Sequence, residues 1–310
     1  MAAARDVLLL AGGGFKTVSY LGLLEARWAE LTPSLRGICG VSAGAMLGLL
    51  LAVGYTPREL RECMLATAWP AVLREVLRDL PIARLLAGKT RSFGAPCDAR
   101  PMRRVLQAWL AAKGVPSNAT FAWLAAQGRP AFACVVASLA TGRLLQLDAS
   151  TAPSCSLLRA VLASAAVPFV FAPVRVGGEW CVDAGVVNNV PISVVRRAWP
   201  HWRRTLVLMP HAVSGRPESA WTLLLWHRAN FMVLAELRQA RTYDVEVVQL
   251  PLVPDDVSTF SPGASLALLV WQGRLMHLCR RHRAALAGAF LLCVARLLRP
   301  RYGGRRLPKA

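Results

Sequence analysis

The sequence predicts an α/β fold, with a mostly parallel central sheet that helices cover on both faces. Short apolar runs alternate along the chain with longer segments of helical periodicity, which is the pattern of parallel strands joined by crossover helices. Two of these runs end in glycine-rich turns that open directly into a helical segment. The chain has 310 residues, of which 55% are hydrophobic, and such a chain can bury a large core.

The first apolar run, residues 7–11, is interpreted as a buried strand, and helical spacing follows over residues 17–30. Between them lie three consecutive glycines, Gly12, Gly13 and Gly14. Consecutive glycines at a helix start expose backbone N–H groups, which suit a phosphate or the oxyanion of acyl transfer. A Walker phosphate loop needs a further glycine followed by Lys and Ser or Thr, which is absent. The dinucleotide fingerprint fails because Thr17 occupies its last glycine position.

The second run, residues 36–41, ends in the pentapeptide Gly40-Val41-Ser42-Ala43-Gly44. This G-x-S-x-G pattern is typical of a serine held on a sharp strand-to-helix turn, and the apolar residues 43–53 are interpreted as the buried helix that follows. Gly40 and Gly44 allow close backbone approach, and the positive end of the helix dipole favours negative charge on the serine oxygen. Ser42 is therefore the best candidate nucleophile in the chain.

The segment between this turn and the next strand is predicted to be helical, over residues 58–68, 73–87, 100–113 and 121–127. In a lipase such an insertion commonly forms an acyl-binding groove or a lid. The apolar candidates to line a groove are Trp69, Leu85, Leu86 and Phe93. Ordinary packing between helices explains the same four residues, and the sequence leaves both interpretations open.

The remaining strands are predicted at residues 131–138, 144–147, 206–209 and 245–250. A hairpin over residues 174–182, which turns at Gly177-Gly178, comes before the motif Asp183-Ala184-Gly185. This places a carboxylate at a strand end. Taken alone, a single Asp-x-Gly is more typical of a loop aspartate that hydrogen-bonds its own turn.

The three motifs together, in this order and at this spacing, resemble those of the patatin-like phospholipases. That family carries a glycine-rich oxyanion loop, then a G-x-S-x-G elbow, and a D-G-G or D-G-A motif well downstream. Residues 163–173 are similar to the family's Ala/Ser-rich segment ending in proline, and Asn189-Val190-Pro191 is similar to its Asn-x-Pro. The resemblance covers residues 7–251 and implies a patatin-like version of the predicted fold.

Three positions depart from the family pattern. Thr17 stands where most members have glycine, Lys16 where many have arginine, and Ala184 where the first glycine of the aspartate motif usually lies. None of these changes removes a reacting atom. Threonine is poorly tolerated wherever φ is positive, so Thr17 puts the rate of the reaction in question more than its mechanism.

The resemblance implies catalysis by a Ser-Asp dyad without a metal or organic cofactor. Asp183 would accept the proton of Ser42, which attacks an ester carbonyl to give an acyl-enzyme. The implied oxyanion donors are Gly12, Gly13 and Gly14, and the supporting motif residues are Lys16, Gly40, Gly44 and Gly185. The alternative is a triad with one of the five histidines, which all follow the acid: His201, His211, His227, His277 and His282. Position 42 leaves room for only two strands before the nucleophile, too few for the usual α/β-hydrolase sheet.

The net charge of +20 is unevenly distributed, because residues 274–310 contain ten basic residues and no Asp or Glu. We expect a patatin-like catalytic domain over residues 1–263 and a basic helical extension over residues 264–310. The uncharged run 284–295 would measure about 18 Å as a helix, too short for a bilayer core of about 30 Å. A basic amphipathic segment fits an anionic membrane surface, and the alternative is a last packed helix followed by a basic tail.

The sequence thus predicts a cytoplasmic, peripherally membrane-associated lipid acyl hydrolase whose substrate is a membrane lipid. The N-terminus shows no pattern of a cleaved signal peptide, and the eight cysteines contain no C-x-x-C, which favours a reducing compartment. The alternatives are an inactive lipid-binding protein or a basic nucleic-acid-binding protein on the same fold. No nucleic-acid-binding motif accompanies the basic residues, so we expect no nucleic acid partner. The oligomeric state stays open.

Overall fold

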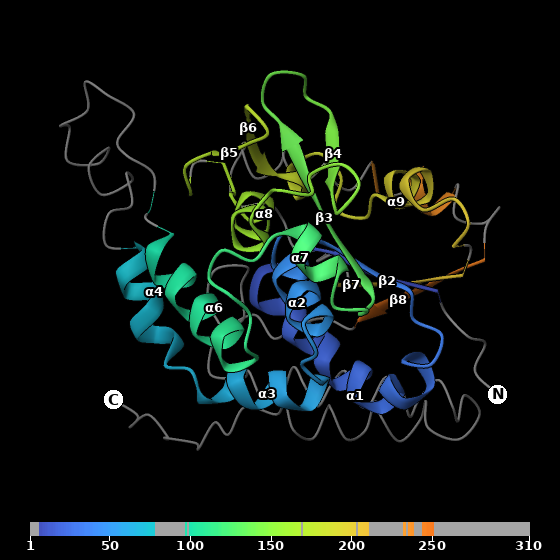
Figure 1. The fold of residues 1–310 in the computed structure, drawn as a ribbon, viewed down its shortest axis with the longest axis horizontal. Coiled ribbons are helices and arrows are strands. Elements are labelled where there is room, and N and C mark those ends of the chain that lie inside the picture. Colours follow the sequence, from blue (N-terminus) through green and yellow to red (C-terminus); the bar gives the residue numbers. More distant parts are fainter. Residues whose placement is uncertain are drawn as a thin grey trace, which may run out of the picture.

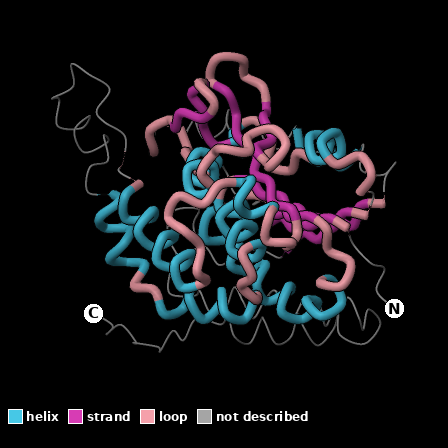
Figure 2. Tube along the Cα trace, in the orientation of Figure 1, coloured by secondary structure: helices cyan, strands magenta, loops and turns pink. Residues whose placement is uncertain are grey.

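The computed structural model describes residues 6–77, 97, 99–168, 170–202, 204–210, 232–233, 235–238 and 244–250. Within these residues one eight-stranded sheet runs through the centre, and helices pack on both of its faces (Figures 1 and 2). The predicted fold class is confirmed. Several predicted features lie outside the described residues. They are residues 78–87 of the predicted helix 73–87, the extension 264–310, Leu85, Leu86, Phe93 and four of the histidines.

The strand order is β5-β6-β3-β2-β1-β7-β8, and β4 pairs with β3. Five strands form the parallel part of the sheet, namely β1 (Val7–Leu10), β2 (Gly37–Val41), β3 (Ala131–Ser138), β7 (Thr205–Pro210) and β8 (Val245–Leu250). Three antiparallel strands complete the sheet: β4 (Leu144–Leu147) and β6 (Glu179–Asp183) pair with β3, and β5 (Val174–Val176) pairs with β6. The carboxyl ends of the parallel strands therefore meet along one edge, where the glycine loop and the serine turn follow β1 and β2.

The parallel strands are apolar throughout because both faces of the sheet are buried. Leu8 and Leu10 of β1 belong to the core on one face, and Val7 and Leu9 belong to the core on the other. Each face needs its own helical cover, as expected for a parallel sheet. The larger core packs under α1, α2, α7 and α8, and the smaller one packs under α9 and a segment that includes Val233.

Most helices begin and end close to where the periodicity predicts. The bounds are α1 (Ser19–Leu31) after a 3₁₀ turn η1 (Gly14–Val18), α2 (Ala43–Ala52), α3 (Pro57–Ala66), α4 (Trp69–Leu77), α6 (Arg100–Ala112), α7 (Phe121–Ala125), α8 (Leu157–Ser164) and α9 (Ile192–Ala198). Two helices, α8 and α9, were not predicted, since a segment of seven or eight residues barely completes two turns of a periodic pattern. Helix α4 begins four residues before the predicted start, because Pro70 is compatible with a first helical turn.

Among the helices of the described residues, none is long and apolar enough to cross a bilayer.

Candidate active site

Ser42 lies on a strained turn between β2 and α2. Its backbone has φ 56° and ψ −128°, and among the described residues it is the only non-glycine with a positive φ. A Cβ added at Gly40 would lie 2.4 Å from the Cα of Ala45, and one added at Gly44 would lie 2.3 Å from the carbonyl oxygen of Leu10. Both glycines are therefore required by close backbone contacts, and the G-x-S-x-G pattern forms the predicted elbow.

A buried serine from α8 holds this elbow against β3. The backbone N–H of Ser42 donates to Ser164 Oγ over 3.0 Å, and the Ser164 hydroxyl donates to the carbonyl oxygen of Val135 over 2.7 Å. Ser164 is completely buried, so these bonds are shielded from water. Sequence analysis placed Ser164 in a family-like segment but assigned it no role. A serine within an apolar run of small residues is the signal that could have identified it.

Asp183 reaches Ser42 because of the register of β3. β2 ends at Val41 opposite Val135, and Asp183 at the end of β6 lies opposite Val136, the next residue of β3. The two strand ends therefore lie next to each other. The Asp183 carboxylate is buried and accepts hydrogen bonds from the Ser42 hydroxyl and, over 2.7 Å, from the Gly185 N–H.

Burial raises the pKa of Asp183 from 3.8 to about 6, although both hydrogen bonds favour the charged form and oppose this shift. A carboxylate with this pKa is a stronger base than an exposed one and is still ionised at neutral pH. The arrangement therefore presents a hydroxyl to a base that can accept its proton.

The loop after Asp183 is linked to the glycine loop by Asn189. Its Oδ1 accepts from the Gly12 N–H over 2.8 Å, and its Nδ2 donates to the Gly12 carbonyl over 3.0 Å. A Cβ at Gly185 would lie 3.0 Å from the Asp183 carboxylate, so the glycine allows the loop to turn back tightly. Ala184 is completely buried in the smaller core, and its methyl group is accommodated there. The family-atypical alanine is thus compatible with the motif.

Fewer backbone N–H groups of the glycine loop are available to an oxyanion than the sequence implied. The Gly12 N–H points at Asn189 and is not available for an oxyanion. Among the described residues, no acceptor takes the N–H groups of Gly13 and Gly14, which lie where η1 begins. Thr17 lies further along η1 without a positive φ, and its hydroxyl donates to the Gly14 carbonyl over 2.8 Å. The anticipated conflict between threonine and the loop therefore does not arise.

Lys16 is partly buried beside the same loop. Burial lowers the pKa of its ammonium group below the usual value, because the charged form loses hydration. Its carbonyl accepts from the Ser19 hydroxyl over 2.7 Å, which stabilises the join between η1 and α1.

A second buried carboxylate, Glu236, holds the segment that follows the aspartate loop. Its Oε1 accepts from Asn188 Nδ2 over 2.9 Å and from the Ser193 hydroxyl over 2.5 Å, and its Oε2 accepts from the Ser193 N–H over 2.9 Å. Sequence reasoning missed Glu236, because no local motif surrounds it and its partners lie more than forty residues away.

An apolar cavity of about 150 Å³ opens at Ser42. Among the described residues that line it, Thr17 and Ser42 are polar and none is charged. Its walls come from η1, α1, α2, α3, α4 and α6 and from residues 165–171, and they include Phe15, Met46, Leu60, Trp69, Trp109 and Phe171. Trp69, a predicted groove residue, packs edge-on against Phe15, with ring centroids 5.0 Å apart. Trp69 therefore serves both the groove and the helix packing.

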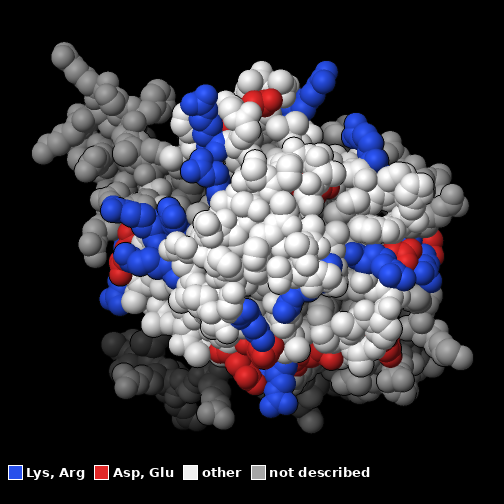
Figure 3. All heavy atoms as spheres, in the orientation of Figure 1, with Lys and Arg blue, Asp and Glu red and all other residues white. Residues whose placement is uncertain are grey.

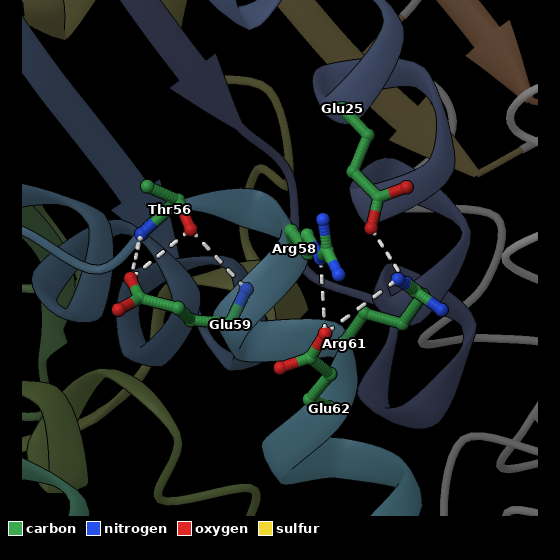
Figure 4. A network of polar contacts seen from close by, with 6 residues as sticks. All are labelled: Glu25, Thr56, Arg58, Glu59, Arg61 and Glu62. Carbon is green, nitrogen blue, oxygen red and sulfur yellow. Dashed lines mark hydrogen bonds and ion pairs between the residues drawn. The ribbon is translucent and has the colours of Figure 1, made fainter.

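Ionic contacts fix the helix that forms one wall of this cavity (Figure 4). Thr56 and Glu59 form a capping box at the start of α3, in which each side chain accepts the other's backbone N–H. Arg61 of α3 pairs with Glu25 of α1 over 2.6 Å. Glu59 also pairs with Lys113 at the end of α6 over 2.8 Å. Leu60 and Met64 of α3 are thereby held against the cavity.

Of the five histidines, His201 alone lies within the described residues. It is exposed and precedes β7, so it lies at the edge of the sheet opposite the carboxyl ends that carry Ser42 and Asp183. The described ranges also contain no group of three or more His, Cys, Asp or Glu side chains placed to hold a metal ion.

Comparisons with known proteins address the family and the fold. A family model described as patatin-like phospholipase matches residues 8–196. The chain is 24% identical over 187 residues to "Probable lipid hydrolase 463L" of Invertebrate iridescent virus 6, which covers 60% of this chain and 62% of that protein. Its fold is similar to that of VipD from Legionella pneumophila, with a TM-score of 0.50, 18% identity, and 88% of this chain and 66% of VipD covered. The chain thus spans about three fifths of the length of its viral relative.

Proposed function

The chain belongs to the patatin-like phospholipase family, and we propose that it hydrolyses acyl ester bonds of glycerolipids or phospholipids with Ser42 as nucleophile and Asp183 as base. One observation carries this proposal: the buried Asp183 carboxylate accepts the Ser42 hydroxyl at the mouth of an uncharged cavity. The name of the viral relative supports a lipid substrate.

The proposed reaction begins when Asp183 takes the proton of Ser42 and the serine oxygen attacks the ester carbonyl carbon. The carbonyl oxygen becomes an oxyanion and accepts hydrogen bonds from the N–H groups of Gly13 and Gly14. Collapse of this intermediate breaks the ester bond, and the departing alcohol takes the proton from Asp183. A water then gives a proton to Asp183 and attacks the acyl-enzyme. The fatty acid leaves and Ser42 regains its proton.

The acyl chain of the substrate would occupy the apolar cavity. Burying each methylene group there contributes about 0.8 kcal/mol, and none of the described lining residues is charged. The polar remainder of the lipid would then stay outside, because these lining residues offer it no ionic partner. This arrangement favours lipid esters over small polar esters.

The test is activity together with covalent labelling of the purified chain. Ser42→Ala is expected to abolish hydrolysis of a chromogenic ester, and Asp183→Asn nearly so, because each removes an atom that acyl transfer needs. A fluorophosphonate probe should label the unmodified chain at Ser42 alone.

His211→Ala provides the control for the dyad. It should keep activity within about tenfold, equivalent to about 1.4 kcal/mol of barrier, if Asp183 is the base. A loss comparable to that of Ser42→Ala would instead support a histidine triad. Labelling of another serine, or full activity of Ser42→Ala, would overturn the proposal, and a chain that binds lipid without turnover would be a lipid-binding protein.

A further inference from the structure

Two large apolar side chains are exposed side by side at the tip of the antiparallel part of the sheet. Leu139, just after β3, is 55% exposed, and Trp180 on β6 is 54% exposed. The Leu139 N–H donates to the Trp180 carbonyl over 2.8 Å, so the backbone holds the two residues together. Among the described residues, the only other large hydrophobic side chain with comparable exposure is Leu65. A paired, exposed Trp and Leu is unusual on a surface that contacts only water.

Three arginines lie on the elements next to this pair, Arg143 between β3 and β4, Arg159 on α8 and Arg175 on β5, and we call these arginines together with Leu139 and Trp180 the tip. All three arginines are exposed, and none forms an ion pair with a described carboxylate. Arg175 lies directly opposite Trp180 in the β5–β6 ladder. The Arg159 guanidinium donates to the backbone carbonyl of Arg175 over 3.2 Å. The nearby Glu179 carboxylate accepts a hydrogen bond from the Ser138 hydroxyl. Figure 3 shows basic side chains on both sides of the molecule's end over β4, β5 and β6, with uncharged surface and an acidic patch between them.

The tip lies beyond the candidate active site along β3. Trp180 is three residues from Asp183 on β6, and Leu139 is three residues past Val136, the partner of Asp183. At about 3.3 Å per strand residue, the tip lies about 10 Å beyond Asp183. This distance matches the depth, about 5–10 Å, to which apolar side chains enter a membrane interface.

The segment that lines one side of the cavity leads into β5, which pairs with the strand that carries Trp180. Val167, Val170 and Phe171 line the cavity and are partly exposed, and residues 172–174 continue from them into β5. No charged residue occurs between residues 165 and 174. A short uncharged stretch of chain therefore joins the wall of the cavity to the tip.

We propose that the tip is a membrane contact that inserts Trp180 and Leu139 into the interface of an anionic bilayer and brings the mouth of the cavity to the lipid. Tryptophan is favoured at membrane interfaces, and the arginines complement anionic headgroups. The bilayer as partner rests on the proposed function. The contact differs from the basic extension 264–310, because every tip residue lies within the described body of the protein.

The test measures binding of the full chain to vesicles, in a Ser42→Ala background so that lipid is not consumed. With vesicles of phosphatidylglycerol and phosphatidylcholine, Trp180→Ser and Leu139→Ser should each weaken binding about fivefold. Arg143→Glu should weaken it about tenfold at low salt, and much less on pure phosphatidylcholine. Matched controls are Leu65→Ser on α3, at the far end of the molecule from β5 and β6 in Figure 1, and Arg103→Glu on α6.

When the same tip substitutions are made in a chain that keeps Ser42, a short soluble ester should be hydrolysed at the unmodified rate. Hydrolysis of vesicle lipid should fall together with vesicle binding. Circular dichroism checks folding, and Leu139→Ser, in an exposed turn, keeps the test valid if Trp180→Ser unfolds. Vesicle binding that equals that of the two control variants would overturn the tip as a membrane contact. That result would leave the proposed function intact, which depends on labelling of Ser42 and on turnover of the soluble ester.

Discussion

Asp183 shows how one residue lowers stability while enabling chemistry. A carboxylate this deeply buried loses hydration, and two hydrogen bonds do not fully compensate, so its pKa rises to about 6. The folded state therefore holds the Asp183 proton more tightly than the unfolded chain does. The proposed acyl transfer needs a base at this position, which would explain why the protein retains a costly ionised group at neutral pH.

Asp183→Asn is expected to stabilise the protein at neutral pH while nearly abolishing activity. Between pH 3.8 and about 6 the folded state binds more protons at this position, so the stability contributed by protonated Asp183 is lost as pH rises through that window. The loss corresponds to about 3 kcal/mol, and asparagine avoids it. Chemical denaturation should show the variant as the more stable protein at pH 8, and a difference close to zero at pH 4. A variant that is less stable than the unmodified chain at pH 8 would contradict the assigned cause of the shift.

The site residues that were predicted from the sequence lie in short local motifs. The residues whose roles were missed act through contacts between distant parts of the chain. Ser42 and Asp183 stand in short motifs whose neighbours explain their geometry, and family resemblance brought them together. Ser164 acts on Ser42 across 122 positions, and Asn189 acts on Gly12 across 177. No single-sequence pattern specifies such hydrogen bonds, because they depend on how β3, α8 and the aspartate loop pack.

At the scale of elements, the strands were predicted more accurately than the helices. Strands β3, β4 and β8 have the predicted bounds, because each is a mainly apolar run that ends at a turn, a charged residue or a proline. The short helices α8 and α9 escaped prediction, although α8 supplies Ser164. The elbow depends on both a residue and the packing of two elements, because Gly44 allows α2 to start in contact with the end of β1.

Gly44→Ala and Gly48→Ala separate a packing requirement from helix propensity in α2. The new methyl group of Gly44→Ala would meet the Leu10 carbonyl at 2.3 Å, so we expect a loss of more than about 2 kcal/mol in stability or a displaced Ser42. Either result lowers ester turnover. Gly48→Ala meets only side chains, those of Ile38 at 3.2 Å, Phe132 at 3.4 Å and Leu10 at 3.7 Å, and gains helix propensity, so stability should stay within about 1 kcal/mol. Equal behaviour of the two variants in thermal melts and esterase assays would show that the elbow contact is not limiting.

The order of the strands explains why the site lies where it does in the whole molecule. β1 is central, with β2 and β3 on one side and β7 and β8 on the other, so the connections diverge at its carboxyl end. Such a switch point leaves a crevice for a ligand. The glycine loop after β1 and the elbow after β2 both lie there. Periodicity predicted a mostly parallel sheet, but the position of β7 beside β1 is a long-range pairing that no local pattern encodes.

The charge of the whole chain leads to a last prediction, which concerns residues 264–310. We propose that this extension attracts the protein to anionic membranes, because residues 274–310 carry ten basic residues and no acidic one. Each such residue contributes about 1 kcal/mol close to an anionic surface, and the attraction falls as salt shortens the Debye length. Truncation after Pro262 should therefore weaken binding to anionic vesicles at low salt without changing turnover of a soluble ester. A full-length variant with glutamine at Arg299, Arg301, Arg305 and Arg306 should shift binding in the same direction. A circular-dichroism melt must accompany both: an unfolded truncation would assign the segment to the core, and a folded one with unchanged vesicle binding would exclude a membrane role for the extension.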